Sequence, residues 1–375
     1  MQDVFQEKCK RIRGWLSERR YDGLLLTSQT SFSWITGGRG FIGIASEAAC
    51  AKVLITQEHC VLLVNNIEAN RLREEEIRYD HLQLKITPWF EHESDVTLLA
   101  QEFIKSGAVI VHEEEVANEL MQLRYPLTEC ERQLYHELGM DAAQALELVC
   151  RTLQRGEREY HVAGQLAKAC YERGIEPTLT LVAADERAMR YRHPLPTHQC
   201  IDRYVLIALG ARRHGLVASL SRLVHFGTPP EELVRKHQAV TAVDGLFIHL
   251  TRPGRAVGDI FEKAALCYEE HGFKDEWNSH HQGGMTGYAG REYRATLKSQ
   301  EVVGEHQAFA WNPSISGVKS EDTIVIGTEE NHILTRTGDF PEVTIHIDGM
   351  HYPRPAILQR NDHRYHALKR PLISL

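Results

Sequence analysis

The sequence lacks the segments that carry a chain into or across a membrane. No apolar run in its 375 residues approaches the roughly 20 that a membrane-spanning helix needs. The opening stretch MQDVFQEKCKRIRGWL is charged and amphipathic, with neither an apolar signal core nor a small-residue cleavage site. We therefore expect a cytoplasmic protein that has no membrane partner.

Paired cysteines and an excess of positive charge are also missing. The eight cysteines are scattered and none forms a CxxC pair, which excludes zinc-ribbon and thioredoxin-type sites. We expect them to be buried or idle thiols in a reducing compartment. The net charge of −8 argues against nucleic acid as a partner. What is present, 42% hydrophobic and 25% charged residues over this length, is typical of a globular protein of two domains.

Strands alternate with helices in the first third of the chain, which predicts an α/β domain. Helical periodicity predicts helices at 4–19, 67–78 and 94–105. Apolar runs predict strands at 24–27, 51–56, 59–64, 82–86 and 108–112, the second and third of them forming a hairpin. We expect this domain to cover residues 1–126.

A second domain is expected over residues 127–375. Thr128 and Glu131 match a capping box, in which the hydroxyl and the carboxylate satisfy free backbone donors, and Gly156 is expected to end that helix. Further helices are predicted at 159–173, 230–250 and 257–271. Strands are predicted at 204–209, 216–224, 308–312, 323–326 and 332–335, with a turn at 210–215. Helix pairs between strand pairs indicate an α+β domain.

Several segments resemble one known family along nearly the whole chain. GLLLTSQTSFSWITGG is similar to the first strand and loop of a creatinase-type N-terminal domain, and LTECERQLYHELGMDAAQAL to the first helix of the catalytic domain. YVLIALGARRHGLVASLSRLVHFG resembles the metal-binding hairpin VLIDxGxxxxGYxxDxTRTxxxG. The chain is thus identified as a member of the pita-bread metallopeptidase family, which includes Xaa-Pro aminopeptidases, prolidases and creatinase. This resemblance implies an α+β pita-bread catalytic domain after a smaller α/β creatinase-type domain, and a homodimer.

The resemblance also implies a site for two divalent ions, which the family holds with two Asp, one His and two Glu. The two aspartate positions carry Ala208 and Ser219 here, and the first glutamate position carries Asn312. Ser219 and Asn312 keep the pocket polar without a need for cations, and we expect them to bind substrate. Since three carboxylates are gone, we expect no dinuclear metal site and no cofactor.

Two of the family's five metal-ligand positions keep the residue type that binds metal. Glu321 retains the last glutamate, and either His280 or His281 fits the histidine position. One histidine and one glutamate cannot hold a pair of hard cations. A single weakly held ion, completed by His193, Asp322 or water, stays open.

Creatinase is the informative relative, because it shares the fold, lacks the metals and cleaves a C–N bond with a histidine and carboxylates. The triplet Gly290-Arg291-Glu292 matches its motif, and aligning that triplet without a gap favours His280 as the ligand-position histidine. Its catalytic histidine corresponds to His193. Creatinase keeps glutamates where this chain has Ser221 and Asn312, so creatine itself is a poor candidate substrate.

The candidate histidines each have more than one interpretation. His193 is expected to act as a general acid/base, the alternative being a loop histidine without a role. Arg190 and Arg192 would lower its pKa if they are close in space. The adjacent His280 and His281 are expected to point to opposite faces of an extended strand, so that only one reaches the site.

Some of the charged candidates are expected in the site, and others in structural ion pairs around it. Glu321 is expected in the site, Asp322 beside it as a structural partner, and Arg222 in an internal ion pair. Arg291 either binds a substrate carboxylate in the two-pronged way of guanidinium or belongs to a buried salt-bridge network. Tyr288 either donates a proton to substrate or only packs.

These assignments predict a hydrolase that cleaves a C–N bond in a small amidino or amide compound or a short peptide, without the usual dinuclear site. His193 would act as acid/base, and His280 or His281, Glu321, Asn312 and Ser219 would orient substrate and water. Arg291 and Tyr288 are further candidates for substrate binding. Two alternatives remain. One is a metal-dependent Xaa-Pro aminopeptidase or dipeptidase, and the other is a catalytically inactive pseudo-peptidase that binds a ligand.

Overall fold

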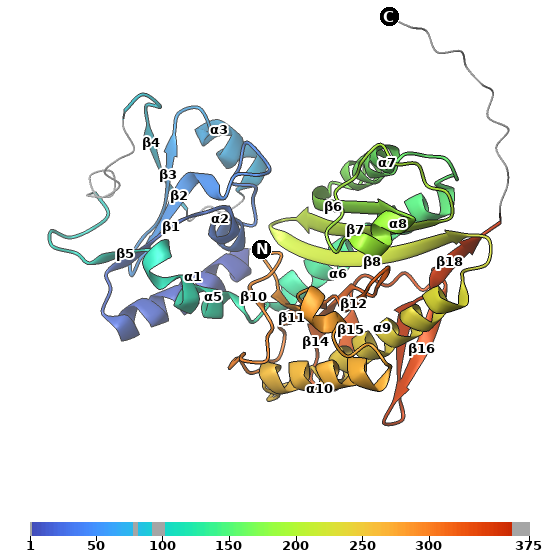
Figure 1. Cartoon of the computed structure of the whole chain (residues 1–375). Helices are drawn as coiled ribbons and strands as arrows, with labels where there is room; N and C mark the ends of the chain where they lie inside the picture. The colour runs from blue at the N-terminus through green and yellow to red at the C-terminus, as the bar shows by residue number, and fades with distance from the viewer. Residues whose placement is uncertain (1, 78–81, 92–101, 362–375) are drawn as a thin grey trace, which may run out of the picture.

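The computed structural model describes residues 2–77, 82–91 and 102–361 (Figure 1). They form an α/β domain followed by a larger α+β domain, which is the fold class that the sequence predicts. Within those ranges, none of the helices combines the length and the apolar character that a bilayer crossing demands.

The first domain is built on one mixed sheet in the order β4-β3-β2-β1-β5. β1 runs antiparallel to β2 and β2 to β3, whereas β4 and β5 pair in parallel with β3 and β1. Helix α1 buries Phe5, Cys9, Ile12 and Leu16, the stripe that its periodicity predicts. The elements are α1 (Gln2–Arg19), β1 (Gly23–Ser28), α2 (Gln29–Thr36), β2 (Ala48–Thr56), β3 (Cys60–Asn65), α3 (Ala69–Arg71), the π-helical η1 (Leu72–Glu76), β4 (Gln83–Thr87), β5 (Ile110–His112), the 3₁₀ turn η2 (Glu113–Val116) and α5 (Ala117–Arg124).

Two predicted helices of this domain differ from the structure. The helix expected at 67–78 is only the short α3 followed by the π-turn η1, and residue 78 lies outside the described residues. Of the helix expected at 94–105, residues 102–105 form turns rather than a helix, and the rest falls outside the described part of the chain. The predicted hairpin of β2 and β3 is confirmed.

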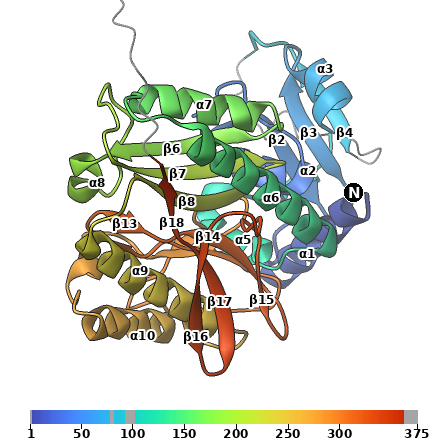
Figure 2. The ribbon, with the colours of Figure 1, turned by 90° about the vertical axis from the view of Figure 1, so that its right-hand side faces the viewer.

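The second domain contains two sheets and two hairpins. The first sheet has the order β18-β8-β7-β6 and the second β10-β9-β11-β14-β15, while β12 pairs with β13 and β16 with β17. Helices α6 and α7 pack on the first sheet, and α9 packs on the hairpins, with α10 against it (Figure 2). The elements are α6 (Glu129–Thr152), α7 (Glu159–Tyr171), β6 (Glu176–Ala184), α8 (Glu186–Arg190), β7 (Tyr204–Arg213), β8 (Leu216–Phe226), α9 (Glu231–Leu250), α10 (Val257–Glu270), the 3₁₀ turn η3 (Glu276–Ser279), β9 (Gly283–Thr286), β10 (Tyr293–Arg294), β11 (Ala308–Trp311), β12 (Ser314–Ile315), β13 (Val318–Lys319), β14 (Asp322–Ile326), β15 (Asn331–Ile333), β16 (Glu342–Ile347), β17 (Met350–Pro355) and β18 (Ile357–Arg360).

Local signals account for the start of α6 and for the β7–β8 hairpin. The predicted capping box is present, with the Thr128 amide donating to Glu131 Oε2 at 2.8 Å, although α6 ends at Thr152, before Gly156. The turn predicted at 210–215 is shorter than expected. It consists of His214 and Gly215, both at positive φ (53° and 81°), which matches the twist of a tight hairpin, so β7 continues to Arg213.

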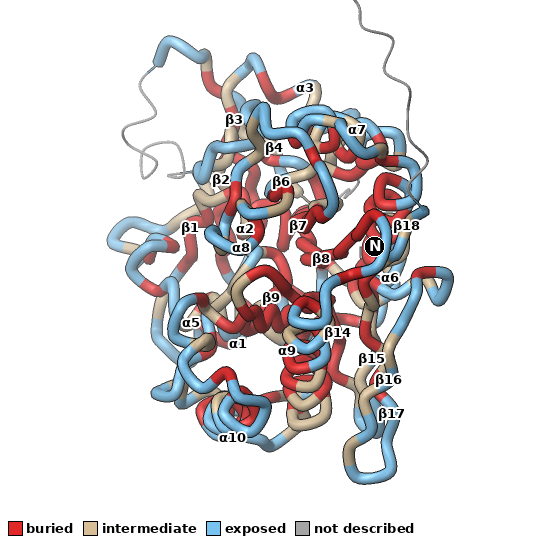
Figure 3. The backbone as a smooth tube through the Cα atoms, turned by 45° about the vertical axis from the view of Figure 1, so that its right-hand side comes forward, coloured by how far each residue is buried: buried red, intermediate tan, exposed pale blue. Residues whose placement is uncertain are grey.

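Strand β8 crosses the start of β14, and this crossing positions the candidate site. The Ser219 amide donates to the Thr323 hydroxyl at 2.8 Å, and the Ser221 amide donates to the Glu321 carbonyl at 3.0 Å. Both strands are buried along their whole length (Figure 3). Side chains that leave β8 and the residues before β14 therefore meet in one place.

Candidate functional site

Three histidines from two loops form a cluster. His193 follows α8, whereas His280 and His281 lie between η3 and β9. His193 Nε2 and His280 Nε2 are 3.0 Å apart, and the ring of His281 is centred 5.7 Å from that of His193. His193 is exposed and His280 buried, so the cluster runs inward from the surface.

The expectation that only one of the adjacent histidines reaches the site is wrong. His280 and His281 precede β9 instead of belonging to a pleated strand, so the alternation of a strand does not apply to them. Their rings stack with centroids 4.4 Å apart, and both face His193 within ring-contact distance. The site therefore contains three imidazoles.

Glu321 holds both of its carboxylate oxygens against side chains of this protein. Oε2 accepts from the Ser221 hydroxyl at 2.6 Å and lies 3.1 Å from the Lys319 ammonium. Oε1 lies 3.3 Å from Nη2 of Arg291, whose Nη1 donates to the Ser219 hydroxyl at 3.3 Å. Burial alone would raise the pKa of Glu321, but Lys319 and Arg291 outweigh burial and lower it. Glu321 is therefore an ionised carboxylate whose negative charge is balanced by Lys319 and Arg291.

The imidazoles are held in their neutral form. Burial, followed by the charge of Lys319, lowers the pKa of His193 and that of His280, and burial with Arg291 and Lys319 lowers the pKa of His281 to about 4. Nδ1 of His280 and Nδ1 of His281 are buried without a hydrogen-bond partner among the described residues. Neutral imidazoles have free lone pairs, which suit proton acceptance or metal ligation.

Positive charge exceeds negative charge around the cluster. Among the largest influences, Lys319, Arg291 and Arg294 lower the pKa of His193, and Glu321 raises it. Arg192, which the sequence predicts near His193, pairs instead with Glu276. The surplus favours an anionic or neutral ligand over a cation.

The residues at the family's ligand positions do not fit two divalent ions. Ala208 lies opposite Ser221 in the β7–β8 register and offers no ligand atom. The backbone amide of Asn312 donates to the Gln282 carbonyl at 3.0 Å. The side-chain oxygen of Asn312 is buried without a partner among the described residues. Glu321 is the one carboxylate there, and an ammonium and a guanidinium already neutralise it. The imidazoles are a different donor set, with one nitrogen from each lying within 4.8 Å of the others.

Other predicted residues lie where they support the structure. Asp322 accepts from Arg222 at 3.0 Å and from Arg354 at 2.5 Å, which is the structural role that the sequence predicts for Asp322 and Arg222. The Tyr288 hydroxyl donates to Glu131 at 2.7 Å, at the junction of the two domains rather than in the histidine cluster.

Sequence reasoning missed Lys319 and underused Ser221. Lys319 is two residues before Glu321, and side chains two apart on an extended chain share a face, so this spacing was a usable signal. Ser221 is opposite Ala208, and its hydroxyl donates to Glu321. The replacement of the family's aspartate by Ala208 does not by itself predict this hydrogen bond.

An α+β domain with the buried β7–β8 hairpin, preceded by an α/β domain, defines a pita-bread protein of the creatinase and prolidase type. The chain belongs to metallopeptidase family M24, whose sequence model matches residues 133–328, while that of the creatinase/prolidase N-terminal domain matches residues 8–126.

Its relatives cover nearly the whole chain. It is 23% identical to an Xaa-Pro dipeptidase from Pyrococcus horikoshii over 89% of this chain and 98% of that protein. The solved prolidase from the same organism superimposes with a TM-score of 0.71 at 21% identity, covering 88% of this chain and 98% of that one. The N-terminal domain of the FACT complex subunit SPT16 from Cicer arietinum has a TM-score of 0.68 at 12% identity, over 90% of this chain and 97% of that one. These structural likenesses show the fold alone.

Proposed function

We propose that this protein is a hydrolase that cleaves a C–N bond in a small amide or amidino compound or a short peptide, without a pair of divalent ions. One observation carries the proposal. Both oxygens of Glu321 are already held by Lys319, Ser221 and Arg291, and the charges of Glu321, Lys319 and Arg291 all act on the pKa of His193 in the histidine cluster. In this proposal, fixed positive charge of the chain itself takes over the neutralising role that cations have in the family.

His193 is the proposed acid/base of the reaction. It is the exposed member of the cluster, and its lowered pKa keeps it a neutral base at pH 7. It takes a proton from water as the water attacks the carbonyl or amidine carbon, and then gives that proton to the leaving nitrogen as the C–N bond breaks. Lys319 and Arg291 stabilise the negative charge that develops on the attacked group.

The charge surplus narrows the substrate class. A free amidinium cation would be repelled by Lys319, Arg291 and Arg294, against which the attraction of Glu321 acts. An N-acyl amino acid, a dipeptide or an amidino compound that bears a carboxylate has the complementary charge. We therefore place anionic and zwitterionic C–N substrates ahead of cationic ones.

A turnover screen with a matched histidine pair tests the proposal. Anionic, zwitterionic and cationic amides and amidino compounds are incubated with the protein in a chelator, and the released amine is measured. His193→Ala should lower kcat by about 10²–10⁴-fold on any substrate found. His193→Gln should retain KM better than kcat. His198→Ala, an exposed histidine of the same loop, should leave both unchanged.

Each outcome of the screen decides between functions. Wild-type turnover by His193→Ala would show that His193 is not the acid/base. If no compound is hydrolysed but one of them binds, and His193→Ala weakens that binding, the chain is a pseudo-peptidase that uses the same pocket for recognition.

The histidine cluster supports one further candidate, a single transition-metal ion. Three imidazole nitrogens within 4.8 Å of one another are a donor set of the kind that zinc accepts. The surrounding positive charge opposes it. One equivalent of bound cobalt or zinc in the wild-type protein, lost in His280→Ala, would favour this candidate over the metal-free reaction.

A further inference from the structure

Two cysteines of the N-terminal domain lie in contact, although they are 51 positions apart. Cys9 is on α1, Cys60 is the first residue of β3, and their sulfur atoms are 3.4 Å apart. Cys9 is fully buried and Cys60 is 6% exposed. A disulfide needs the sulfurs at about 2.0 Å, so they must approach by little more than one ångström.

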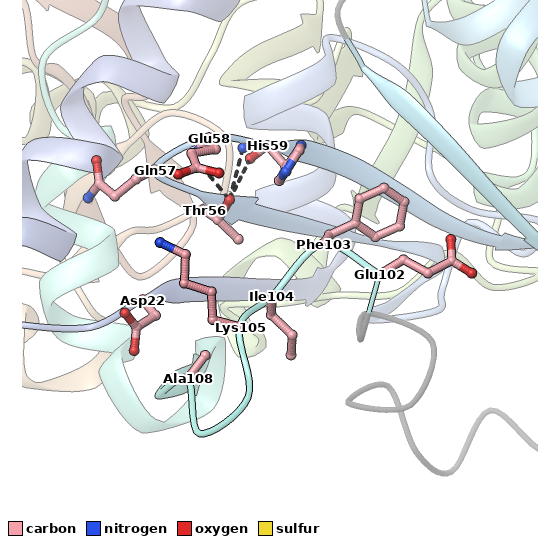
Figure 4. Close-up of a pocket in the computed structure, with 10 residues that line it drawn as sticks. All are labelled: Asp22, Thr56, Gln57, Glu58, His59, Glu102, Phe103, Ile104, Lys105 and Ala108. Carbon is pink, nitrogen blue, oxygen red and sulfur yellow. Dashed lines mark hydrogen bonds between the residues drawn. The ribbon is translucent and has the colours of Figure 1, made fainter.

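The surroundings of Cys60 differ from those of Cys9. A pocket of about 260 Å³ opens onto Cys60, and it is lined by Phe5, Gln6, Arg13, Glu58, His59, Cys60 and Gln83. Nη2 of Arg13 donates to the Cys60 sulfur at 3.4 Å. The adjacent β2–β3 turn is fixed by the Thr56 hydroxyl, which accepts from the amides of Glu58 and His59 and which also borders a second pocket (Figure 4).

These contacts give the two thiols different chemistry. The two sulfur atoms share a hydrogen bond, and this bond together with Arg13 lowers the pKa of Cys60. The same hydrogen bond and burial raise the pKa of Cys9. The thiolate is the reactive form of cysteine. Cys60 is therefore the more reactive thiol and the one that the pocket reaches, and Cys9 is a buried thiol in contact with it.

We propose that Cys60 and Cys9 are a peroxide-oxidised modification site, in which Cys60 reacts with hydrogen peroxide or an alkyl hydroperoxide and Cys9 then closes a disulfide. The Cys60 thiolate attacks the terminal peroxide oxygen, the O–O bond breaks, and the products are a sulfenic acid and water or an alcohol. The Cys9 sulfur then attacks the Cys60 sulfur and displaces hydroxide, which leaves as water with the Cys9 proton. Two thiols and one peroxide thus give one disulfide.

The cross-link would fix α1 to the sheet next to a contact between the domains. Lys8, the neighbour of Cys9, lies 2.6 Å from Glu131 of α6 and 3.2 Å from the Tyr288 hydroxyl. Closing a long loop reduces the conformational freedom of the unfolded chain. The oxidised protein should therefore melt at a higher temperature than the same sample after reduction.

Peptide mapping of the full-length protein tests the inference. After treatment with hydrogen peroxide and capping of free thiols, mass spectrometry should find the Cys9 peptide linked to the Cys60 peptide, lighter than their sum by two hydrogen atoms. Cys9→Ser should accumulate a Cys60 sulfenic acid that a dimedone probe traps. Cys60→Ser should leave Cys9 reduced, and Cys200→Ser, which removes an exposed cysteine, should leave the cross-link unchanged.

The wild-type protein alone can overturn the inference, whether or not the variants fold. Recovery of Cys9 and Cys60 as capped thiols under conditions that oxidise Cys200 would refute the site. Equal oxidation of Cys9 in the Cys60→Ser variant would refute the order of attack.

Discussion

Lys319 links the carboxylate and the imidazoles of the site. Its ammonium is 3.1 Å from Glu321 Oε2, and its charge contributes to the lowered pKa of His193, His280 and His281. A buried lysine in such contact supplies fixed positive charge without a metal. The acid/base properties of the cluster should therefore depend on it.

Replacing Lys319 by Met should shift the pH dependence of turnover. Without the ammonium, a protonated imidazole is less disfavoured, so the pKa of His193 rises toward its ordinary value of 6.5. The neutral base is then lost at a higher pH, and the acid limb of kcat/KM moves upward. Lys319→Arg keeps the charge and should keep the profile, as should the exposed control Lys298→Met. An acid limb that does not move in Lys319→Met would contradict this role.

For single residues, the sequence predicts which ones belong near the site better than it predicts what their side chains contact. Glu321, Asp322 and Arg222 follow from the matched motif, because their backbone positions are those of the hairpin and strand. The orientation of His281 does not, since it depends on where β9 begins. The sequence leaves open whether Tyr288 acts on substrate or packs, because its hydroxyl contacts Glu131 and Lys8, which are far from it in the sequence.

Buried ion pairs join the elements that surround the site. Asp322, at the start of β14, accepts from Arg222 of β8 and from Arg354 of β17. Arg354 also pairs with Asp244 of α9 at 2.8 Å, and Arg222 with Glu147 of α6 at 3.3 Å. One carboxylate thus connects both sheets with helices on either side of the domain.

Replacing Asp322 by Asn should lower the free energy of unfolding by roughly 3–5 kcal/mol, because it leaves two buried guanidinium groups short of negative charge. Urea denaturation followed by far-UV circular dichroism measures the change. Asp339→Asn removes a carboxylate from an exposed loop and should stay within about 0.5 kcal/mol of wild type. Equal stability of the two variants would mean that the network does not hold the sheets together.

Elements with strong local signals were predictable and those defined by tertiary pairing were not. The capping box fixes the start of α6, and apolar runs locate β7 and β8. β6 begins with Glu176-Pro177 and is half exposed, so its sequence carries a weak strand signal. β18 is short and is a strand because it pairs in parallel with β8.

The two domains are joined through α1. Lys8 reaches Glu131 at the start of α6 and Tyr288 beyond β9, and it also donates to the Trp34 carbonyl of α2 at 2.5 Å. All of these side chains are buried. The overall architecture was predictable because the motifs that carry it occur in both domains; how the domains contact one another was not, because it depends on these long-range pairs.

We expect the protein to form a homodimer, as its resemblance to the family implies. Light scattering during size exclusion at micromolar concentration should give a mass near twice the 42.8 kDa of one chain. A mass of one chain across that range would refute the dimer, whatever the outcome of the turnover screen.

The central claim is that side-chain cations neutralise Glu321 in place of two divalent ions, and the metal content of the purified protein tests it most directly. The protein is dialysed against buffer containing manganese, cobalt, iron or zinc, freed of loose ions, and measured by elemental mass spectrometry. Metal affinity requires ligands of the right kind and number, and Ala208, Ser219 and Asn312 do not provide them. The account predicts far less than two ions per chain for every metal, with turnover that survives a chelator. About two ions per chain, or turnover that strictly requires added metal, would contradict it.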